Sequence, residues 1–313
     1  MTPYTVIGGY LGAGKSTLIQ NLLENPGSKR LGLLINDFGA INIDASLIES
    51  ADHNTVELTN GCICCSLSDG FHDALSTLLE AESQPDHILV EASGVADVNT
   101  LAQYGHHPDL SLSGVIVLVD SETIRRQSED HYVGKTILRH LQAADLIVAN
   151  KQDLISHLER DRLRDWLAEQ SPQSIVWPAT EAKVPLEMVL GLNSSSTMPL
   201  ADQSTQETVE DSSPHPKFAR WAWQHPAETS RDAIEAFLSS LPACVIRLKG
   251  LMQTQEGVLE VQVVGRRRGA RRRSVNHQGQ QLIAIGLAQN FDPIMLDQLA
   301  ERYLARSDSG SSS

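Results

Sequence analysis

The chain has 313 residues, 41% of them hydrophobic and 20% charged, which predicts a folded globular protein with room for more than one domain. Its formal net charge of −14 argues against general nucleic-acid binding, and no apolar run reaches the roughly 18 residues that a membrane span needs. The N-terminus, MTPYTVIGGY, lacks a basic start followed by an apolar signal core, so we expect a cytoplasmic protein without a membrane partner.

Short apolar runs alternate with helical patterns through the first half of the chain. The runs lack the polar–apolar alternation of half-exposed strands, so they predict a mostly parallel α/β sheet with helices on both faces. The expected strands are residues 4–8, 32–36, 87–91, 115–120, 146–150 and 175–177, and expected helices include 15–23, 70–81 and 157–169.

The first expected strand leads directly into a GxxxxGKST segment. Glycines allow backbone N–H groups to curl around phosphate oxygens, and the following helix points its positive end at the same anion. This context predicts a P-loop in which Lys15 reaches the β- and γ-phosphates and is catalytic, Ser16 binds Mg²⁺ and Thr17 supports the α-phosphate. The predicted nucleotide-binding residues of this segment are Gly9, Gly12, Ala13, Gly14, Lys15, Ser16 and Thr17.

Three of the four cysteines, Cys62, Cys64 and Cys65, form a CxCC motif. In a reducing compartment such a cluster indicates metal binding or redox chemistry rather than structural disulfides. Three thiolates supply three of the four tetrahedral positions of zinc, with Cu(I), Co²⁺ and Ni²⁺ as alternatives. Adjacent cysteines cannot face one side of a regular strand, so we expect a loop here, beginning at Asn60-Gly61. Buried thiols and redox-active thiols are the other readings.

The expected strand at 87–91 ends in a carboxylate, at the edge where ligands of open α/β sheets bind. We expect Glu91 to hold Mg²⁺ through water or to orient the attacking water, which makes it the second predicted catalytic residue. Gly94 is expected to offer its N–H to the γ-phosphate. His106 and His107 follow in a predicted surface loop, with a metal ligand as the alternative role.

The expected strand at 146–150 runs into Asn150-Lys151-Gln152-Asp153, an NKxD sequence. The Asp153 carboxylate can accept two hydrogen bonds from guanine N1–H and the 2-amino group, whereas adenine has no donors there. An unpaired buried acceptor costs about 1–3 kcal/mol, so the motif predicts GTP rather than ATP. Lys151 is expected to cover the base plane and Asn150 to tie this loop to the P-loop.

The second half of the chain has a different composition. Residues 193–217 are acidic and rich in Ser and Thr, which predicts a flexible linker. Strands expected at 243–249, 258–264 and 281–285 lie between helices expected at 231–240 and 293–304, a pattern typical of a small α+β domain. The predicted organisation is a P-loop domain at 1–192, the linker at 193–217, the α+β domain at 218–305 and a disordered tail at 306–313.

Three weaker signals lie in that second domain. Residues 266–273 hold six arginines, which we interpret as an exposed hairpin tip, with an acidic partner or nucleic acid as the alternatives. Trp221 and Trp223 alternate as in a strand and are expected to pack in the core. Cys244 is expected to be a plain core cysteine in a strand.

Taken in order, these motifs resemble a known family. GGYLGAGKST, Asn36-Asp37-Phe38-Gly39 with Asp44, LTNGCICC, the ExxG at Glu91 and NKQD resemble the CobW-like GTPases, which include ZNG-type zinc chaperones and are related to the nickel accessory GTPases of hydrogenase and urease. VIRLKG, QLIAIG and the last helix resemble the C-terminal domain of that family. The resemblance covers residues 3–191 strongly and 217–305 more loosely.

The resemblance implies GTP binding, slow hydrolysis, zinc binding through the CxCC cysteines and nucleotide-controlled metal delivery to a client metalloprotein. It also implies that residues 36–44 form a first switch loop, in which Asp37 or Asp44 contacts Mg²⁺ or the transported metal. Two departures stand out. The family usually has Glu where this chain has Asp37, and the linker lacks the His-rich stretch of many members.

Other functions are compatible with part of this evidence. The same GTPase could serve cobalt insertion into a corrinoid or metal loading of another enzyme. A metal sensor that holds GTP without turnover is a second alternative, and a small-molecule kinase is a third, although NKQD and CICC argue against it. The client and the oligomeric state, including a homodimer, are left open.

Overall fold

The computed structural model describes residues 1–35, 48–52, 55–58, 63–66, 71–81, 83–94, 96–104, 109–191, 218–265, 267–288 and 290–305, with only the backbone described for those between 48 and 72 and for 218 and 287. Several predicted features lie outside the described residues: Asp37, Asp44, Cys62, His106, His107, the linker at 193–217 and the tail at 306–313. The chain divides into two compact units, Met1–Leu190 and Gly191–Ser313.

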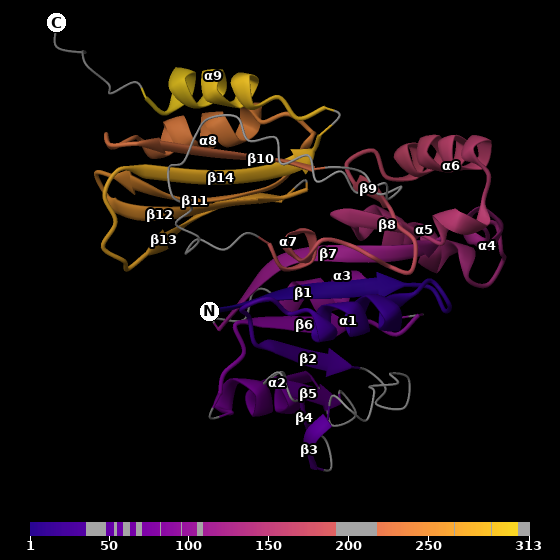
Figure 1. The fold of residues 1–313 in the computed structure, drawn as a ribbon. Coiled ribbons are helices and arrows are strands. Elements are labelled where there is room, and N and C mark those ends of the chain that lie inside the picture. Colours follow the sequence, from indigo (N-terminus) through magenta and orange to yellow (C-terminus); the bar gives the residue numbers. More distant parts are fainter. Residues whose placement is uncertain are drawn as a thin grey trace, which may run out of the picture. The chain divides into compact units, whose positions relative to one another are not determined.

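Within the described part of the first unit, one sheet has the strand order β3-β4-β5-β2-β6-β1-β7-β8-β9 (Figure 1). Its strands are β1 (Thr2–Gly9), β2 (Leu31–Ile35), β3 (Ile48–Asp52), β4 (Thr55–Leu58), β5 (Ile63–Ser66), β6 (His87–Glu91), β7 (Leu110–Asp120), β8 (Leu146–Asn150) and β9 (Ile175–Pro178). Neighbours from β5 to β9 are parallel, whereas β3, β4 and β5 pair antiparallel at one edge. The mostly parallel α/β fold is therefore confirmed.

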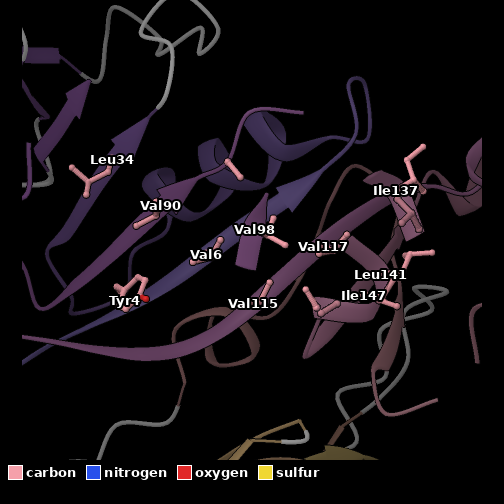
Figure 2. Packing of buried hydrophobic residues seen from close by; sticks show 14 of the residues in the cluster. Tyr4, Val6, Leu34, Val90, Val98, Val115, Val117, Ile137, Leu141 and Ile147 are labelled. Atoms are coloured by element: carbon pink, nitrogen blue, oxygen red, sulfur yellow. The ribbon is translucent and has the colours of Figure 1, made fainter. Parts of the chain in front are cut away.

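Helices cover both faces of this sheet. They are α1 (Lys15–Glu24), α2 (Phe71–Glu80), α3 (Val98–Gln103), α4 (Ile124–Ser128), α5 (Gly134–Ala143), α6 (His157–Gln170) and α7 (Leu186–Leu190). Figure 2 shows one core layer, in which Val6 and Val117 of the central strands pack with Val98 of α3 and Leu141 of α5. On the other side of β1, the Thr5 hydroxyl donates to the Val189 carbonyl of α7. Both faces are buried, and the two acidic residues of the central strands, Glu91 and Asp120, stand at strand ends.

All six strands that the sequence predicted in this unit are present, but the edge formed by β3, β4 and β5 was not predicted. The backbone of Cys64 and Cys65 lies in β5, so the prediction of a loop at these two cysteines is wrong. The physical reason is pairing on both sides, since Cys64 is in register with Leu33 of β2 and with Val56 of β4.

The second unit contains an antiparallel sheet of order β10-β14-β11-β12-β13, with two helices packed against it (Figure 1). Its elements are β10 (Phe218–His225), α8 (Arg231–Ser240), β11 (Val245–Thr254), β12 (Gly257–Val264), β13 (Arg267–Arg273), β14 (Gln280–Leu287) and α9 (Pro293–Tyr303). Trp221 and Trp223 of β10 are buried in the core with Phe237 of α8 and Leu296 of α9, which confirms their predicted packing.

Two predictions for this unit are wrong. Residues 267–273 form the edge strand β13 rather than a hairpin tip, because they pair with β12 along its length, from Val264↔Arg267 to Val258↔Arg273. Cys244 lies in the turn before β11 and is half-buried, so it is not a core strand residue. In the part of the chain that the structure describes, no helix is long and apolar enough to cross a membrane.

Candidate functional site

The glycine-rich segment connects the central strand β1 to α1. Gly9 and Gly14 have positive φ angles of 135° and 105°. A Cβ atom on Gly9 would lie 2.3 Å from the Leu118 carbonyl oxygen, and one on Gly14 would lie 2.4 Å from Nδ2 of Asn150. Both positions therefore require glycine. Gly14 is the N-cap of α1 and provides no side-chain cap, which leaves the positive end of the helix suited to an anion.

Lys15 is buried at the start of α1, where its Nζ donates to the Gly9 carbonyl oxygen at 2.9 Å. Its side chain thus folds back over the glycine-rich segment. Burial lowers the pKa of Lys15, and the nearby Glu91 carboxylate partly offsets this effect. Ser16 and Thr17 follow in the first turn of α1, with Ser16 half-buried and Thr17 exposed. This arrangement places an ammonium group and a hydroxyl at the helix end that faces the loop.

Glu91 ends β6, the strand next to β1, and is in register with Ile7. Burial raises the pKa of the Glu91 carboxyl, and Lys15 partly offsets this effect. Gly94 lies against the glycine-rich segment, because a Cβ on it would come within 3.0 Å of the Leu11 amide nitrogen. The ExxG segment and the predicted P-loop are therefore adjacent, and the buried Lys15 and Glu91 influence each other's pKa.

Asn150 joins three segments at the end of β8. Its buried side chain donates through Nδ2 to the Ala13 carbonyl oxygen at 3.0 Å and accepts through Oδ1 from the Ala182 N–H at 2.8 Å. The first contact is the tie to the P-loop expected from the sequence. The second reaches residues 179–182, which follow β9. The amide thereby holds the NKQD segment, the glycine-rich segment and a third loop in fixed positions.

The rest of the NKQD segment is held from β7. Nζ of Lys151 lies 2.6 Å from Oδ2 of Asp120, the last residue of β7, and Lys151 has a positive φ of 62°. Nε2 of Gln152 donates to Oγ of Ser121 at 2.8 Å. Asp153 lies in the short 3₁₀ helix η4 (Gln152–Leu154) and is exposed. Its carboxylate is therefore accessible, and the two residues before it are held by their side-chain contacts.

Two participants in this geometry were missed from the sequence. Residues 179–182 contribute the Ala182 N–H, and both Glu181 and Ala182 have a φ of 52°. The Glu181 carbonyl also accepts from Nδ2 of Asn21 in α1. Asp120 carries a detectable signal, since it is an acid at the end of a predicted strand. The loop 179–182 carries none, because its contribution is a backbone N–H.

The described residues contain no cluster of three side chains that could together hold a metal ion. Of the predicted metal ligands, Ser16 begins α1, while Cys64 and Cys65 are placed by backbone alone. The cysteine strand β5 neighbours β2, and β2 neighbours β6, so it is two strands from the strand that ends at Glu91.

A glycine-rich loop between the central strand and α1, a carboxylate at the end of the neighbouring strand and an NKQD segment after β8 define a P-loop GTPase. More narrowly, the chain belongs to the CobW/HypB/UreG family. The family model of the CobW/HypB/UreG nucleotide-binding domain matches residues 3–178, and that of the cobalamin synthesis protein cobW C-terminal domain matches residues 218–303.

Individual proteins are similar to the chain over part of their length. It is 35% identical over 238 residues to the zinc chaperone CobW of a Sinorhizobium species, covering 66% of this chain and 67% of that protein. It is 32% identical over 166 residues to the zinc-regulated GTPase metalloprotein activator 1 of Schizosaccharomyces pombe, covering 49% and 40%. The crystal structure of Zn(II)-bound YjiA GTPase from Escherichia coli has a TM-score of 0.50 at 23% identity over 96% of this chain and 98% of that one, a similarity of fold.

Proposed function

We propose that this protein is a GTP-hydrolysing metallochaperone, which binds zinc through Cys62, Cys64 and Cys65 and uses its nucleotide state to control zinc transfer to a client metalloprotein. The observation that carries the nucleotide half is the Asn150 side chain, which fixes the NKQD segment to the predicted P-loop. The metal half is supported by the CxCC motif and by relatives named as zinc chaperones.

The triphosphate would lie along the glycine-rich segment, with its terminal phosphates at Lys15. Backbone N–H groups and the Lys15 ammonium stabilise the charge that develops on the γ-phosphate as a water oxygen bonds to phosphorus and the bond to the bridging oxygen of GDP breaks. Lys15 would move from the Gly9 carbonyl to the phosphates when GTP binds. Glu91 ends the strand beside β1 and interacts with that lysine, so its carboxylate is suited to orienting the attacking water.

The residues present also fit Mg²⁺, which prefers hard oxygen ligands. The Ser16 hydroxyl begins α1, and the Glu91 carboxylate ends the strand beside β1. When bound, the ion would neutralise negative charge on the terminal phosphates. Asp153 would select guanine by accepting from N1–H and the 2-amino group, while Lys151 covers the base plane.

The sheet offers a short route from nucleotide to cysteines. β2 lies between β6, which ends at Glu91, and β5, which contains Cys64 and Cys65. The predicted first switch follows β2 directly in the chain. Only β2 therefore separates the strand that ends at Glu91 from the strand of the two cysteines, and a structural change at the nucleotide could be transmitted through it. Thiolates must stay reduced to bind zinc, so we infer that this exchange takes place in the cytoplasm.

A zinc titration of the full chain, followed by competition with a metal-chelating dye, tests this function. We expect the zinc affinity to differ by about 5–150-fold between the GDP form and the form with a non-hydrolysable GTP analogue. Cys64→Ser should lose tight binding, whereas Cys244→Ser, a cysteine of the second unit, should behave as wild type. Equal zinc affinities in the two nucleotide forms would refute the coupling.

A further inference from the structure

The folded part of the second unit differs in charge from the rest of the chain. Residues 218–305 contain eleven arginine and lysine residues and eight aspartate and glutamate residues, a net charge of +3 in a chain of net charge −14. The positive charge is concentrated in β11, β13 and the segment around them. The six arginines at 266–273 are the sequence feature that the GTPase function does not use.

Because side chains alternate between the two faces of a strand, these cations are divided between the two faces of the sheet. Leu248 of β11 and Val261 of β12 face α8 and α9, where they belong to the core of the unit. Residues one position away point to the other face of the sheet. Lys249, Arg271 and Arg273 therefore share the face turned away from the two helices.

Two other arginines of β13, Arg268 and Arg272, have different roles. Arg268 is on the helix side, where its guanidinium donates to the carbonyl oxygens of Leu238 and Leu241 at the end of α8. Arg272, on the same side, pairs with Glu256 at 2.6 Å. Both contacts are structural, since they cap a helix end and close a strand end.

On the outer face, three cations surround one carboxylate. Glu260 of β12 lies 3.3 Å from Nζ of Lys249, 2.7 Å from Nε of Arg271 and 3.0 Å from Nε of Arg273. The Glu260 side chain is only 2% exposed, whereas the three cations are 25%, 32% and 37% exposed. One buried negative charge therefore organises three accessible positive charges, and it neutralises one of them.

We propose that Lys249, Arg271 and Arg273, which we call the basic triad, form a docking site for an acidic segment of a partner protein. The triad carries a net charge of +2 after Glu260 is counted, and each cation keeps an exposed part of its side chain. Guanidinium and ammonium groups bind carboxylates through charge-assisted hydrogen bonds. Carboxylates of a partner would relieve the mutual repulsion of the three cations.

The surroundings favour an acidic protein over a nucleic acid or a membrane. Proteins that bind single-stranded nucleic acids on a sheet stack the bases on aromatic side chains. The tryptophans of this sheet, Trp221 and Trp223, are instead buried on the helix side. Among the described residues, the large exposed apolar side chains of the second unit, Val275 and Ile294, lie outside the sheet. Leu251 and Ile283 are on its outer face and are half-buried, so the charged groups are favoured over an apolar anchor for lipid there.

The test uses the full chain and a short fluorescent peptide of alternating glutamate and serine residues. The variant Lys249→Gln/Arg273→Gln removes two cations and keeps the Arg271–Glu260 pair. The control Arg231→Gln/Arg272→Gln removes two cations of the same unit, on α8 and on the helix side of β13. We expect the triad variant to bind the peptide about tenfold more weakly at low salt and the control within about twofold of wild type.

GTP hydrolysis should be unchanged in both variants, which separates this proposal from the proposed GTPase cycle. If the triad variant fails to fold, Arg273→Gln alone should still weaken peptide binding about threefold. The proposal is overturned if wild type does not bind the peptide or if the control loses as much affinity as the triad variant. Tighter binding of an oligonucleotide or of anionic vesicles, in competition with the peptide, would overturn it too.

Discussion

The two units place their polar chemistry in different parts of a sheet. In the first unit both faces of a mostly parallel sheet are buried, and Gly9, Glu91, Asp120 and Asn150 all stand at the ends of strands. In the second unit an antiparallel sheet has helices on one side, and Glu260 with the basic triad lies on the other face. Layer architecture therefore decides whether a sheet is suited to enclosing a small ligand at its strand ends or to meeting a partner on a flat face.

The largest effect is expected on GTP hydrolysis, from a change at Lys15 in the predicted nucleotide site. Lys15→Ala removes the ammonium group that balances γ-phosphate charge, so GTP hydrolysis should fall by about 10²–10³-fold. Phosphate release under saturating GTP measures it. Lys135→Ala, an exposed lysine of α5, is the matched control and should retain full activity. Hydrolysis by Lys15→Ala at the wild-type rate would remove Lys15 from the catalytic site.

The next effect concerns the base. Asp153→Asn replaces a double acceptor with a group that also donates, so GTP affinity should fall about 100-fold while the affinity for xanthosine triphosphate rises. Competition against a fluorescent guanine nucleotide measures both affinities. Asp161→Asn, on the exposed side of α6, should change neither. An unchanged preference for guanine would show that Asp153 does not contact the base.

A smaller effect is expected on stability. Asn150→Ala leaves the Ala13 carbonyl and the Ala182 N–H without their partner, which should lower the stability of the first unit by about 2 kcal/mol. Amide hydrogen exchange of β1 and β8 reports this loss within the unit. Asn99→Ala, at an exposed position of α3, serves as the control. Unaltered protection in β1 and β8 would mean that the three segments hold together without this amide.

The smallest effect is a pH dependence in the second unit. Burial alone would raise the pKa of Glu260, but Lys249, Arg271 and Arg273 outweigh it and bring the pKa below its ordinary value. The carboxylate therefore stabilises the folded unit above the ordinary glutamate pKa, and this contribution is lost as the pH falls through the lower folded pKa.

Urea unfolding across this acidic range should show a loss of about 1 kcal/mol in wild type that Glu260→Gln lacks. Glu235→Gln, which removes an exposed helix pair with Arg231, should keep the wild-type slope. A Glu260→Gln variant with the same acid dependence as wild type would show that other carboxylates cause the loss.

Local patterns in the sequence predict the centre of the first unit well. Each central strand is a continuous apolar run, and the glycine-rich, ExxG and NKQD motifs each follow such a run. The ends of these strands and their polar groups can therefore be predicted from the sequence. The edge at β5 is not readable, because four residues containing two cysteines become a strand through pairing with β2 and β4. Pairing between distant segments of the chain cannot be read from local propensity.

The same limit explains β13 and the loop at 179–182. Arginine runs favour exposed turns, but here the buried Glu260 and the ladder with β12 hold them in a strand. The loop contributes a backbone N–H to Asn150, and any residue except proline can supply that group. Neither contribution has a sequence pattern of its own.

In the proposed cycle, the nucleotide site and the cysteine segment share one free energy of coupling. Because coupling is reciprocal, the affinity of the wild-type chain for a non-hydrolysable GTP analogue, measured with and without zinc, tests it most directly. We predict that zinc changes this affinity by the same factor by which the analogue changes the zinc affinity, and that Cys64→Ser abolishes the change. An analogue affinity that is identical with and without bound zinc would show that the two sites are not coupled.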